Sequence, residues 1–277
     1  MQDSFSIAAG STIGAALRAA PLPALESRIL LGKALQLSRI QLITQSERVL
    51  NDDETRSATE LIRRRLAGEP IAYIVGEREF YGLAFHVTPD VLIPRPETEL
   101  LVELALNRMP ERSSVLDLGT GSGAIAVAIA HARADAKVTA VDANTAALVI
   151  AERNARRHGA NVRFLQSDWY GALGNEHFNL IVSNPPYIAN GDLHLSQGDL
   201  RFEPVDALTD HNDGLSALRI IINGANERLA PGGWLLMEHG YDQSAAVRAL
   251  LASSEFAEVQ SWADLAGIER VTGGRKT

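Results

Sequence analysis

From Val115 onward the sequence alternates short apolar runs of strand length with longer runs whose apolar residues recur every three or four positions. Strands that alternate with helices across short loops form a parallel sheet covered by helices on both faces. The sequence therefore predicts an α/β, doubly wound domain. Strands are expected at 115–118, 137–141, 162–165, 178–183, 234–238, 258–262 and 270–272, helices at 97–106, 124–131, 145–158, 215–229 and 243–251, and a Pro-Gly-Gly turn at 231–233.

The first part of the sequence has a helical pattern instead. Apolar spacing predicts helices at 25–35, 40–43 and 51–66. Asn51 is expected to cap the last helix, with Glu54 completing a capping box, and Gly68 to end it. Short β-like pieces then predict a hairpin, with strands at 71–75, 80–81 and 84–87. We expect three parts: a helical domain over 1–70, a β-hairpin linker over 71–88 and the α/β domain over 89–277.

Charge and cysteine content narrow the possible partners. The chain has 26 Lys and Arg against 34 Asp and Glu, a formal net charge of −8. Residues 1–85 carry ten charges of each sign, so the whole excess lies on residues 86–277. An acidic domain is a poor match for a nucleic acid, whose phosphates need basic residues. Because cysteine is absent and the histidines are scattered, we expect neither a disulfide nor a metal site.

The sequence does not predict export or membrane insertion. Residues 1–10 lack the basic stretch and apolar run of a secretory signal. The longest uninterrupted apolar run, 124–130, has seven residues, far below the roughly 18 that a membrane span needs. We therefore expect a cytoplasmic protein. We also expect a monomer, since no long apolar stripe is left over for a second copy.

A glycine-rich turn follows the first strand of the α/β domain. Glycines there let the chain turn sharply and let a ligand approach the backbone, and this turn lies where open parallel sheets bind ligands. The next strand ends at Asp142, whose carboxylate can accept hydrogen bonds from both ribose hydroxyls of a nucleoside. The candidate cofactor-binding residues of the turn are Gly119, Thr120, Gly121, Ser122 and Gly123.

Two cofactors are compatible with this turn. Gly121, Gly123 and Ala126 match the G-x-G-x-x-A fingerprint of dinucleotide-binding proteins, which allows a nicotinamide cofactor. Asp117 and the tighter spacing of the three glycines are instead similar to the first motif of S-adenosylmethionine methyltransferases. A tight turn without any ligand is the third interpretation. The turn alone does not decide between them.

A tetrapeptide after the fourth strand, Asn184-Pro185-Pro186-Tyr187, is expected at the same rim as the glycine turn. A nitrogen conjugated to a carbonyl or an aromatic ring is a poor nucleophile, because its lone pair is delocalised. An Asn carbonyl and a backbone carbonyl can accept its two N–H groups, orient its lone pair and stabilise developing positive charge. The prolines stiffen the loop and the Tyr187 ring offers a flat wall. A merely rigid turn is the alternative.

Together the two motifs favour methylation of a planar nitrogen by S-adenosylmethionine. A glutamine amide and the exocyclic amines of adenine or guanine both fit this chemistry, so a nucleic-acid methyltransferase remains the enzymatic alternative. A non-catalytic adaptor, with the helical domain as binding module, is the alternative outside enzymes.

Beyond these motifs, the sequence resembles the peptide chain release factor glutamine N-methyltransferases over nearly its whole length. The segments that carry the resemblance are Gly68 to Tyr73 with Gly76 and Phe80, Leu92 to Glu99, and Gln197 to Pro204. The resemblance implies transfer of a methyl group from S-adenosyl-L-methionine to the glutamine amide of the Gly-Gly-Gln motif in class 1 release factors, leaving S-adenosyl-L-homocysteine. It implies a seven-stranded class I methyltransferase sheet ending in an antiparallel strand, behind a small helical domain that recognises the release factor.

The resemblance also implies roles for single residues. Residues 119–123 and Asp142 would bind the cofactor, and Trp169 would lie against its adenine. Asn184 would hold the target amide and touch the methionine part of the cofactor, and the pocket would be completed by Pro185, Pro186 and Tyr187. Two questions stay open: whether Arg95 and Glu99 order the pocket entrance or join the domains, and whether the loop 192–204 is a lid or a solvated connection.

Overall fold

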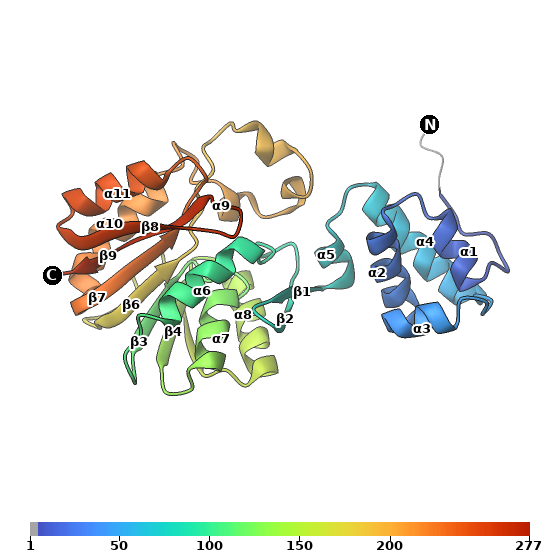
Figure 1. The fold of residues 1–277 in the computed structure, drawn as a ribbon, viewed down its shortest axis with the longest axis horizontal. Coiled ribbons are helices and arrows are strands. Elements are labelled where there is room, and N and C mark those ends of the chain that lie inside the picture. Colours follow the sequence, from blue (N-terminus) through green and yellow to red (C-terminus); the bar gives the residue numbers. More distant parts are fainter. Residues whose placement is uncertain (1–4) are drawn as a thin grey trace. The chain divides into compact units, whose positions relative to one another are not determined.

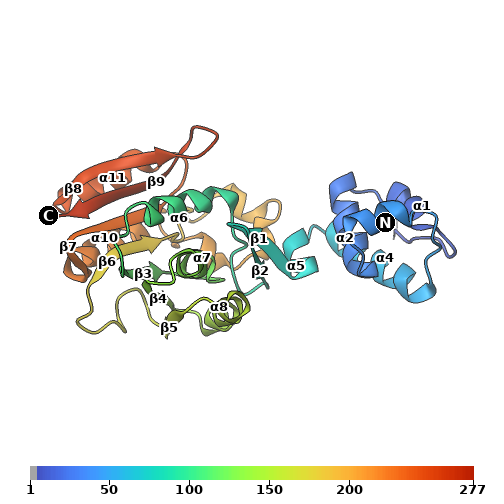
Figure 2. The ribbon, with the colours of Figure 1, turned by 60° about the horizontal axis from the view of Figure 1, so that its bottom comes forward.

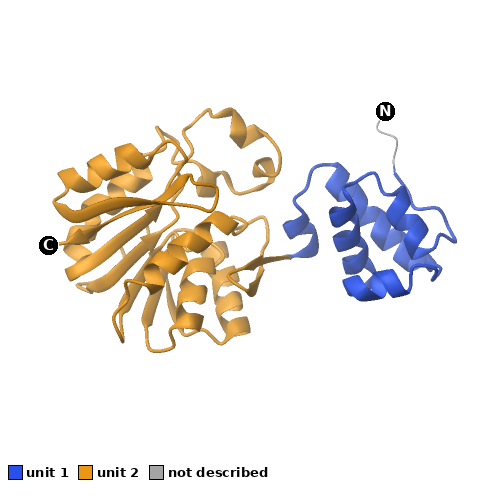
Figure 3. Ribbon diagram, in the orientation of Figure 1, with its two compact units in different colours: residues 1–76 blue, residues 77–277 orange. Residues whose placement is uncertain are grey.

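A computed structural model describes residues 5–277. The chain forms two compact units, residues 1–76 and 77–277 (Figure 3). The boundary lies at Gly76, six residues beyond the expected end of the helical domain at residue 70. Within the described residues, no helix has both the length and the apolar character needed to cross a membrane.

In the first unit, the regular elements of residues 5–76 are all helices. Its elements are α1 (Ile13–Ala19), α2 (Ala24–Leu35), α3 (Arg39–Thr44), α4 (Asp52–Leu66) and α5 (Ile71–Val75). The predicted cap of α4 is confirmed: Asn51 Oδ1 accepts from the Glu54 amide and Glu54 accepts in return from the Asn51 amide. The core is built from fully buried side chains of α1, α2 and α4, among them Ile13, Leu30, Leu31 and Ile62.

The strand expected at 71–75 is wrong, because this segment is helix α5. Its β-branched residues suggested a strand, but Pro70 precedes the first turn, and Gly76 ends the helix in the left-handed conformation. Ala72, Tyr73 and Ile74 are buried, and Ile74 joins the core of the first unit. Burial against neighbouring helices therefore outweighs β-propensity here. The hairpin is confined to β1 (Glu77–Phe80) and β2 (Leu83–His86).

The second unit contains a seven-stranded sheet in the order β5-β4-β3-β6-β7-β9-β8 (Figures 1 and 2). The first five strands in this order are parallel, and β9 runs antiparallel to both of its neighbours. The strands are β3 (Ser114–Leu118), β4 (Lys137–Asp142), β5 (Val162–Gln166), β6 (Phe178–Ser183), β7 (Leu229–Glu238), β8 (Phe256–Ala263) and β9 (Glu269–Lys276). The expected class I methyltransferase sheet and its antiparallel strand are thus confirmed.

Helices cover both faces of this sheet. The side chains of α6 (Glu99–Leu106), α7 (Ala124–Ala132) and α8 (Thr145–His158) belong to the core on one face, and those of α10 (Ser216–Arg228) and α11 (Ser244–Ser253) to the core on the other. Helix α7 is apolar nearly all round because its first seven residues, 124–130, are all buried. The short elements η1 (Pro96–Thr98), η2 (Leu193–Ser196), η3 (Leu200–Phe202) and α9 (Val205–Leu208) complete the unit.

The expected turn at 231–233 is also corrected. Strand β7 begins at Leu229 and continues through these residues, and its pairing with β6 shifts register between Phe178 and Leu180. Gly233 approaches the backbone of β6 so closely that a Cβ there would lie 3.0 Å from the Asn179 carbonyl oxygen. The Pro-Gly-Gly sequence therefore forms an irregularity within a strand, where glycine permits close backbone approach.

Candidate active site

The carboxyl ends of β3, β4 and β6 surround a cavity of about 470 Å³ in the second unit. Strand order reverses at β3, which pairs with β4 on one side and with β6 on the other. This is the position at which open α/β sheets bind ligands, and the volume lies in the range of about 300 to 1,000 Å³ usual for cofactor pockets. Of the predicted site residues, the cavity wall includes Gly119, Thr120, Gly121, Ser122, Asp142, Trp169, Asn184 and Pro186.

The glycine turn after β3 is ordered by hydrogen bonds to the end of β4. The Gly119 and Thr120 amides both donate to the Val141 carbonyl at 2.9 Å, and the Gly121 amide donates to Asp142 Oδ2 at 2.8 Å. Gly119 and Gly121 have φ values of 71° and 53°, in the left-handed region that favours glycine. Apart from Gly121 and its two chain neighbours, no atom of residues 5–277 lies within 4 Å of the position a Gly121 Cβ would take, so a ligand has room beside this backbone.

Glycine is required at position 123 for helix packing rather than for ligand access. Gly123 does not line the cavity, and a Cβ on it would lie 3.0 Å from the Cβ of Ala151 in α8. Its φ of 81° is also left-handed. The third glycine therefore allows α7 to start against α8 without a clash.

Two carboxylates lie close to the turn. Asp117 is fully buried and accepts from the Thr120 hydroxyl at 2.7 Å, and burial raises its pKa to about 7. Asp142 accepts from the Gly121 amide and from the Asn144 amide, the latter at 2.9 Å. Burial raises the pKa of Asp142 from its usual range, against the opposing effect of these backbone donors. Each Asp142 oxygen has a second lone pair for a ligand hydroxyl.

Trp169 lies on the same side of the cavity as the turn. It follows β5 with a φ of 45°, and its carbonyl accepts from the Ser167 hydroxyl at 2.8 Å. Its ring edge lies 3.8 Å from the position a Gly119 Cβ would take. The ring and the Gly119 backbone therefore form one corner of the cavity, where a planar group could lie between them.

The tetrapeptide is anchored from the end of β6. The Ser183 hydroxyl donates to the Leu118 carbonyl of β3 at 2.7 Å, which joins the ends of the two strands. Asn184 lines the cavity, and its Nδ2 donates to the Thr98 hydroxyl at 3.2 Å. Its Oδ1 is buried and has no hydrogen-bond partner within residues 5–277. An acceptor left in this state is available to an N–H donor of a ligand.

Tyr187 is held at both ends and, like Pro185, does not line the cavity. Its hydroxyl donates to Glu238 Oε1 at 3.3 Å, and its carbonyl accepts from Gln243 Nε2 at 2.9 Å. Burial is the main cause that raises the pKa of Tyr187 well above its usual range, so its hydroxyl stays protonated. The tetrapeptide is thus fixed by residues more than 50 positions away along the chain.

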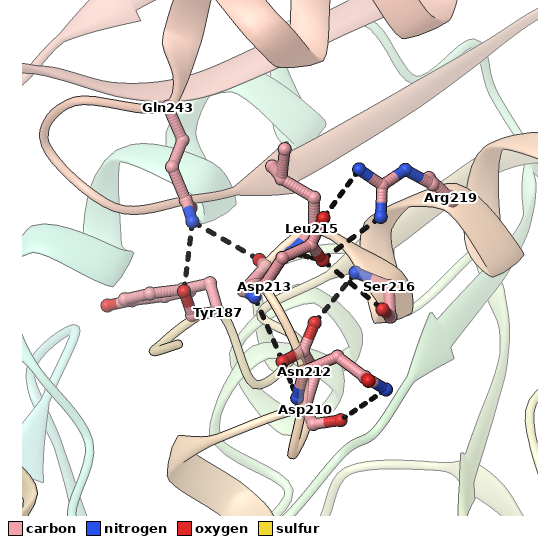
Figure 4. Close-up of polar contacts among 9 residues, drawn as sticks. Tyr187, Asp210, Asn212, Asp213, Leu215, Ser216, Arg219 and Gln243 are labelled. Atoms are coloured by element: carbon pink, nitrogen blue, oxygen red, sulfur yellow. Dashed lines mark hydrogen bonds and ion pairs between the residues drawn. The ribbon is translucent and has the colours of Figure 1, made fainter. Parts of the chain in front are cut away.

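The loop 210–216 is connected to Tyr187 of the tetrapeptide through Gln243 (Figure 4). Gln243 Nε2 bridges the carbonyls of Tyr187 and Gly214, and Asp210 accepts from the amides of Asn212, Gly214 and Ser216. Gly214 has a φ of 79°, and a Cβ on it would come within 2.5 Å of the Tyr187 carbonyl oxygen. Only glycine fits this contact without displacing the tetrapeptide.

Arg95 and Glu99 make different contacts. Arg95 lines the cavity and forms an ion pair with Glu203, whose buried carboxylate also accepts from the Ile93 amide at 3.0 Å. Glu99 accepts from the Tyr81 amide of the hairpin at 2.9 Å. Arg95 therefore ties the end of the 192–204 loop to the cavity wall, and Glu99 ties α6 to the hairpin.

Sequence reasoning missed the residues that fix the tetrapeptide. Thr98 belongs to the segment that carries the family resemblance, but no role was assigned to it. Glu238 ends an apolar strand and Gln243 directly precedes α11, and neither position has a local sequence signal for a role in fixing the tetrapeptide. For the described part of the chain, no group of acidic or histidine residues could hold a metal ion.

Comparisons with known proteins agree with this geometry. Residues 96–199 match the family model described as "Methyltransferase small domain", and residues 11–76 match the one described as "PrmC N-terminal domain". The release factor glutamine methyltransferase of Burkholderia pseudomallei is 58% identical over 274 residues, which cover 96% of each chain. The chain belongs to the release factor glutamine methyltransferase family. It is accordingly an S-adenosylmethionine-dependent methyltransferase.

More distant similarities show how far the family and the fold extend. The release factor glutamine methyltransferase of Salmonella typhimurium is 47% identical, over 94% of this chain and 95% of that protein. A methyltransferase structure from Pyrococcus furiosus has a TM-score of 0.56 at 20% identity and covers 77% of this chain and 96% of its own. A 16S rRNA methyltransferase structure from T. thermophilus has the same TM-score at 23% identity, and the match covers 73% of this chain and 50% of that chain. The two structures show the shared fold.

The residues around the cavity fit the family's cofactor. The open space beside Gly121 admits a ligand against the backbone. The Asp142 carboxylate can accept from ribose hydroxyls, and the corner formed by Trp169 and Gly119 suits a planar base. The unpartnered Asn184 Oδ1 supplies an acceptor at the other end of the site.

Proposed function

We propose that this chain transfers the methyl group of S-adenosyl-L-methionine to the side-chain amide nitrogen of the Gly-Gly-Gln glutamine in class 1 release factors. The observation that carries this proposal is Asn184 Oδ1, a buried acceptor without a partner among the described residues, beside a cofactor-sized cavity. A primary amide presents two N–H donors, and an N–H donor is the hydrogen-bond partner that Asn184 Oδ1 lacks. The Gln amide would thus complete the hydrogen bonding of the site.

The cofactor would lie along the carboxyl ends of β3, β4 and β5. Residues 119–123 would provide the backbone against which it lies, Asp142 would accept from its ribose, and Trp169 would cover its adenine. When bound, the cofactor supplies an electrophilic methyl group on a sulfonium. The chain's own task is then to orient the amide nitrogen toward that methyl group and to exclude water.

Asn184 would perform the main part of this orientation. Its Oδ1 and the Pro185 carbonyl would accept the two N–H groups of the glutamine amide, which turns the nitrogen lone pair toward the methyl group. The same oxygens would stabilise the positive charge that grows on the nitrogen during transfer. No general base is required, because the methylated nitrogen can release its proton to solvent. Pro186, which lines the cavity, would form part of the wall of the substrate pocket, and Tyr187, which lies outside the cavity wall, would complete the pocket by holding the tetrapeptide in place.

A protein substrate suits the charge of the second unit better than a nucleic acid does. Residues 86–277 hold 16 basic and 24 acidic residues, so a phosphate backbone would meet an excess of like charge. We propose accordingly that the chain acts in the cytoplasm on release factors, as a monomer and without direct nucleic-acid contact, and that residues 1–70 recognise the release factor.

Tritiated methyl transfer tests this proposal directly. Wild-type enzyme would be incubated with a purified release factor, with the same factor carrying Ala in place of the Gly-Gly-Gln glutamine, and with ribosomal RNA. We expect label in the first substrate alone. Label in the RNA, or equal label in the two release factors, would overturn the proposed substrate.

A further inference from the structure

Asn154 of α8 is a fully buried polar residue whose side-chain amide is bonded to two separate backbone segments. Its Oδ1 accepts from the His86 amide at 2.8 Å. Its Nδ2 donates to the His86 carbonyl at 3.0 Å and to the Ser122 carbonyl at 2.8 Å. One side chain therefore joins the last residue of β2 in the hairpin to the glycine turn after β3.

The three backbone partners fix the orientation of the Asn154 amide. An Asn side chain offers an acceptor oxygen and an NH₂ group with two hydrogens, and a half turn would exchange them. A backbone N–H can only donate and a carbonyl can only accept. The His86 amide therefore requires the oxygen, and the carbonyls of His86 and Ser122 require the two hydrogens. The opposite rotamer would leave all three backbone groups without a match.

The bond to Ser122 lies at the end of the turn, where α7 begins. Ser122 lines the cavity and is followed by Gly123, whose missing Cβ makes room for Ala151. Ala151 precedes Asn154 by about one helical turn, so α8 holds the end of the glycine turn both by packing and by a hydrogen bond. A buried carbonyl that loses its donor is unfavourable. Without Asn154, the Ser122 backbone would shift to find another donor, and with it the surface offered to the cofactor.

The bond to His86 connects the same helix to the hairpin. Helix α8 lies beside the hairpin in both ribbon views (Figures 1 and 2). His158, about one turn beyond Asn154, is bonded through Nε2 to the Ala84 carbonyl at 2.8 Å. Its side chain has no hydrogen bond to the glycine turn within residues 5–277. Asn154 thus contacts hairpin and turn, whereas His158 contacts the hairpin without the turn.

We propose that Asn154 is a positioning residue for the cofactor, an inference that rests on the cofactor site proposed above. It holds the Ser122 carbonyl and couples the glycine turn to the hairpin at His86, so that order in one stabilises order in the other. Asn154 does not line the cavity and does not touch the reacting atoms. Because such coupling is reciprocal, a ligand that binds against the turn must also stabilise the hairpin at His86.

Matched substitutions test the coupling by calorimetry with S-adenosyl-L-homocysteine. Asn154→Ala removes the bonds to both segments, and His158→Ala removes a hairpin contact alone. We expect the Kd to rise roughly 10- to 30-fold in Asn154→Ala and to stay within about threefold in His158→Ala. The kcat for a release factor at saturating cofactor should stay within about threefold in Asn154→Ala, because the groups at the reacting atoms are intact.

Two calorimetric results would overturn the proposal. A role in stability alone would lower the free energy of unfolding of Asn154→Ala, measured in urea, and leave its Kd unchanged. An equal rise of Kd in Asn154→Ala and His158→Ala would mean that the hairpin contact matters and the Ser122 bond does not. An unchanged Kd in Asp142→Asn would instead overturn the proposed cofactor site.

Hydrogen exchange of the wild-type enzyme provides the second measurement. We expect saturating S-adenosyl-L-homocysteine to slow exchange of the His86 amide about 10-fold more than exchange of the amides in β8, at the opposite edge of the sheet from β5. The difference should disappear in Asn154→Ala. Equal slowing at His86 and in β8 in the wild type would overturn the coupling. This comparison needs no substitution, so it decides alone should Asn154→Ala not fold.

Discussion

The glycine turn after β3 and the tetrapeptide after β6 lie at the ends of neighbouring strands, yet they are held in place differently. In the turn, the backbone amides of residues 119, 120 and 121 are bonded to the end of β4, the adjacent strand. In the tetrapeptide, Asn184 is held from Thr98, and Tyr187 from Glu238 and Gln243. One motif is ordered by a neighbouring strand and the other by three distant segments.

This difference assigns cofactor binding to the glycine turn and methyl transfer to the tetrapeptide. The backbone amides of residues 119, 120 and 121 already have hydrogen-bond acceptors within the protein. A ligand in this region therefore meets a backbone that is already ordered, together with the remaining lone pairs of the Asp142 carboxylate. The tetrapeptide instead keeps one buried acceptor unsatisfied. Support from several distant segments is what allows such an acceptor to persist, because a mobile loop would turn it toward water or a neighbouring donor.

Removal of the Asn184 side chain, with its unpartnered Oδ1, should cause the largest loss of activity. We expect Asn184→Ala to lower kcat for a release factor by about 10²- to 10³-fold, as loss of an oriented transition-state hydrogen-bonding group does. Cofactor affinity measured by calorimetry should change by less than about tenfold, because the turn and Asp142 are intact. Asn107→Ala, at an exposed position after α6, is the control. Unchanged methylation in Asn184→Ala would contradict the proposed role.

A pair of glycine substitutions compares the rigidity of the two regions. Gly214→Ala combines a left-handed backbone with a Cβ within 2.5 Å of the Tyr187 carbonyl, and should lower the free energy of unfolding by about 2 to 4 kcal/mol. Gly121→Ala introduces the strain of a left-handed backbone but no close contact, since only its chain neighbours lie within 4 Å of the new Cβ among the described residues. It should lower the free energy of unfolding by about 1 to 2 kcal/mol. Urea unfolding measures both. Equal costs would mean that the Tyr187 contact is not rigid.

The smallest effect on function is expected for Asp142, the carboxylate beside the glycine turn. Asp142→Asn should weaken cofactor binding by roughly 10- to 30-fold, because its NH₂ group would face the Gly121 or Asn144 amide and one acceptor is lost. The kcat at saturating cofactor should change by less than about threefold. Asp242→Asn, exposed and outside the cavity wall, is the control. A large loss of kcat at unchanged cofactor Kd would reverse the division of roles.

Most of the second unit could be predicted from the sequence, because strand-helix alternation repeats over many residues. All seven predicted strands are present, and β6 and α8 have the predicted bounds. The errors occurred where local preference and burial disagree. Residues 71–75 include three β-branched side chains but are helical, and the Pro-Gly-Gly sequence at 231–233 lies within β7. Helix α1, of only seven residues, was not predicted at all.

The candidate site divides in the same way. The glycine turn, Asp142 and Asn184 were predicted because each follows a strand, and parallel strands bring their carboxyl ends to one edge. Thr98, Glu238 and Gln243 were not, because their importance depends on contacts across 51 to 86 positions of sequence. Periodicity contains no information on such contacts.

The sequence by itself determined the family, the class of sheet and the two motifs at its edge, because each of these is a local pattern of residue types. Only the tertiary structure decided that Gly123 serves helix packing while Gly121 borders open space, and that Asn184 keeps a buried oxygen without a partner. The physical reason is that a hydrogen bond or a close contact is a property of two residues. Only folding brings Thr98 to Asn184 and Glu238 to Tyr187.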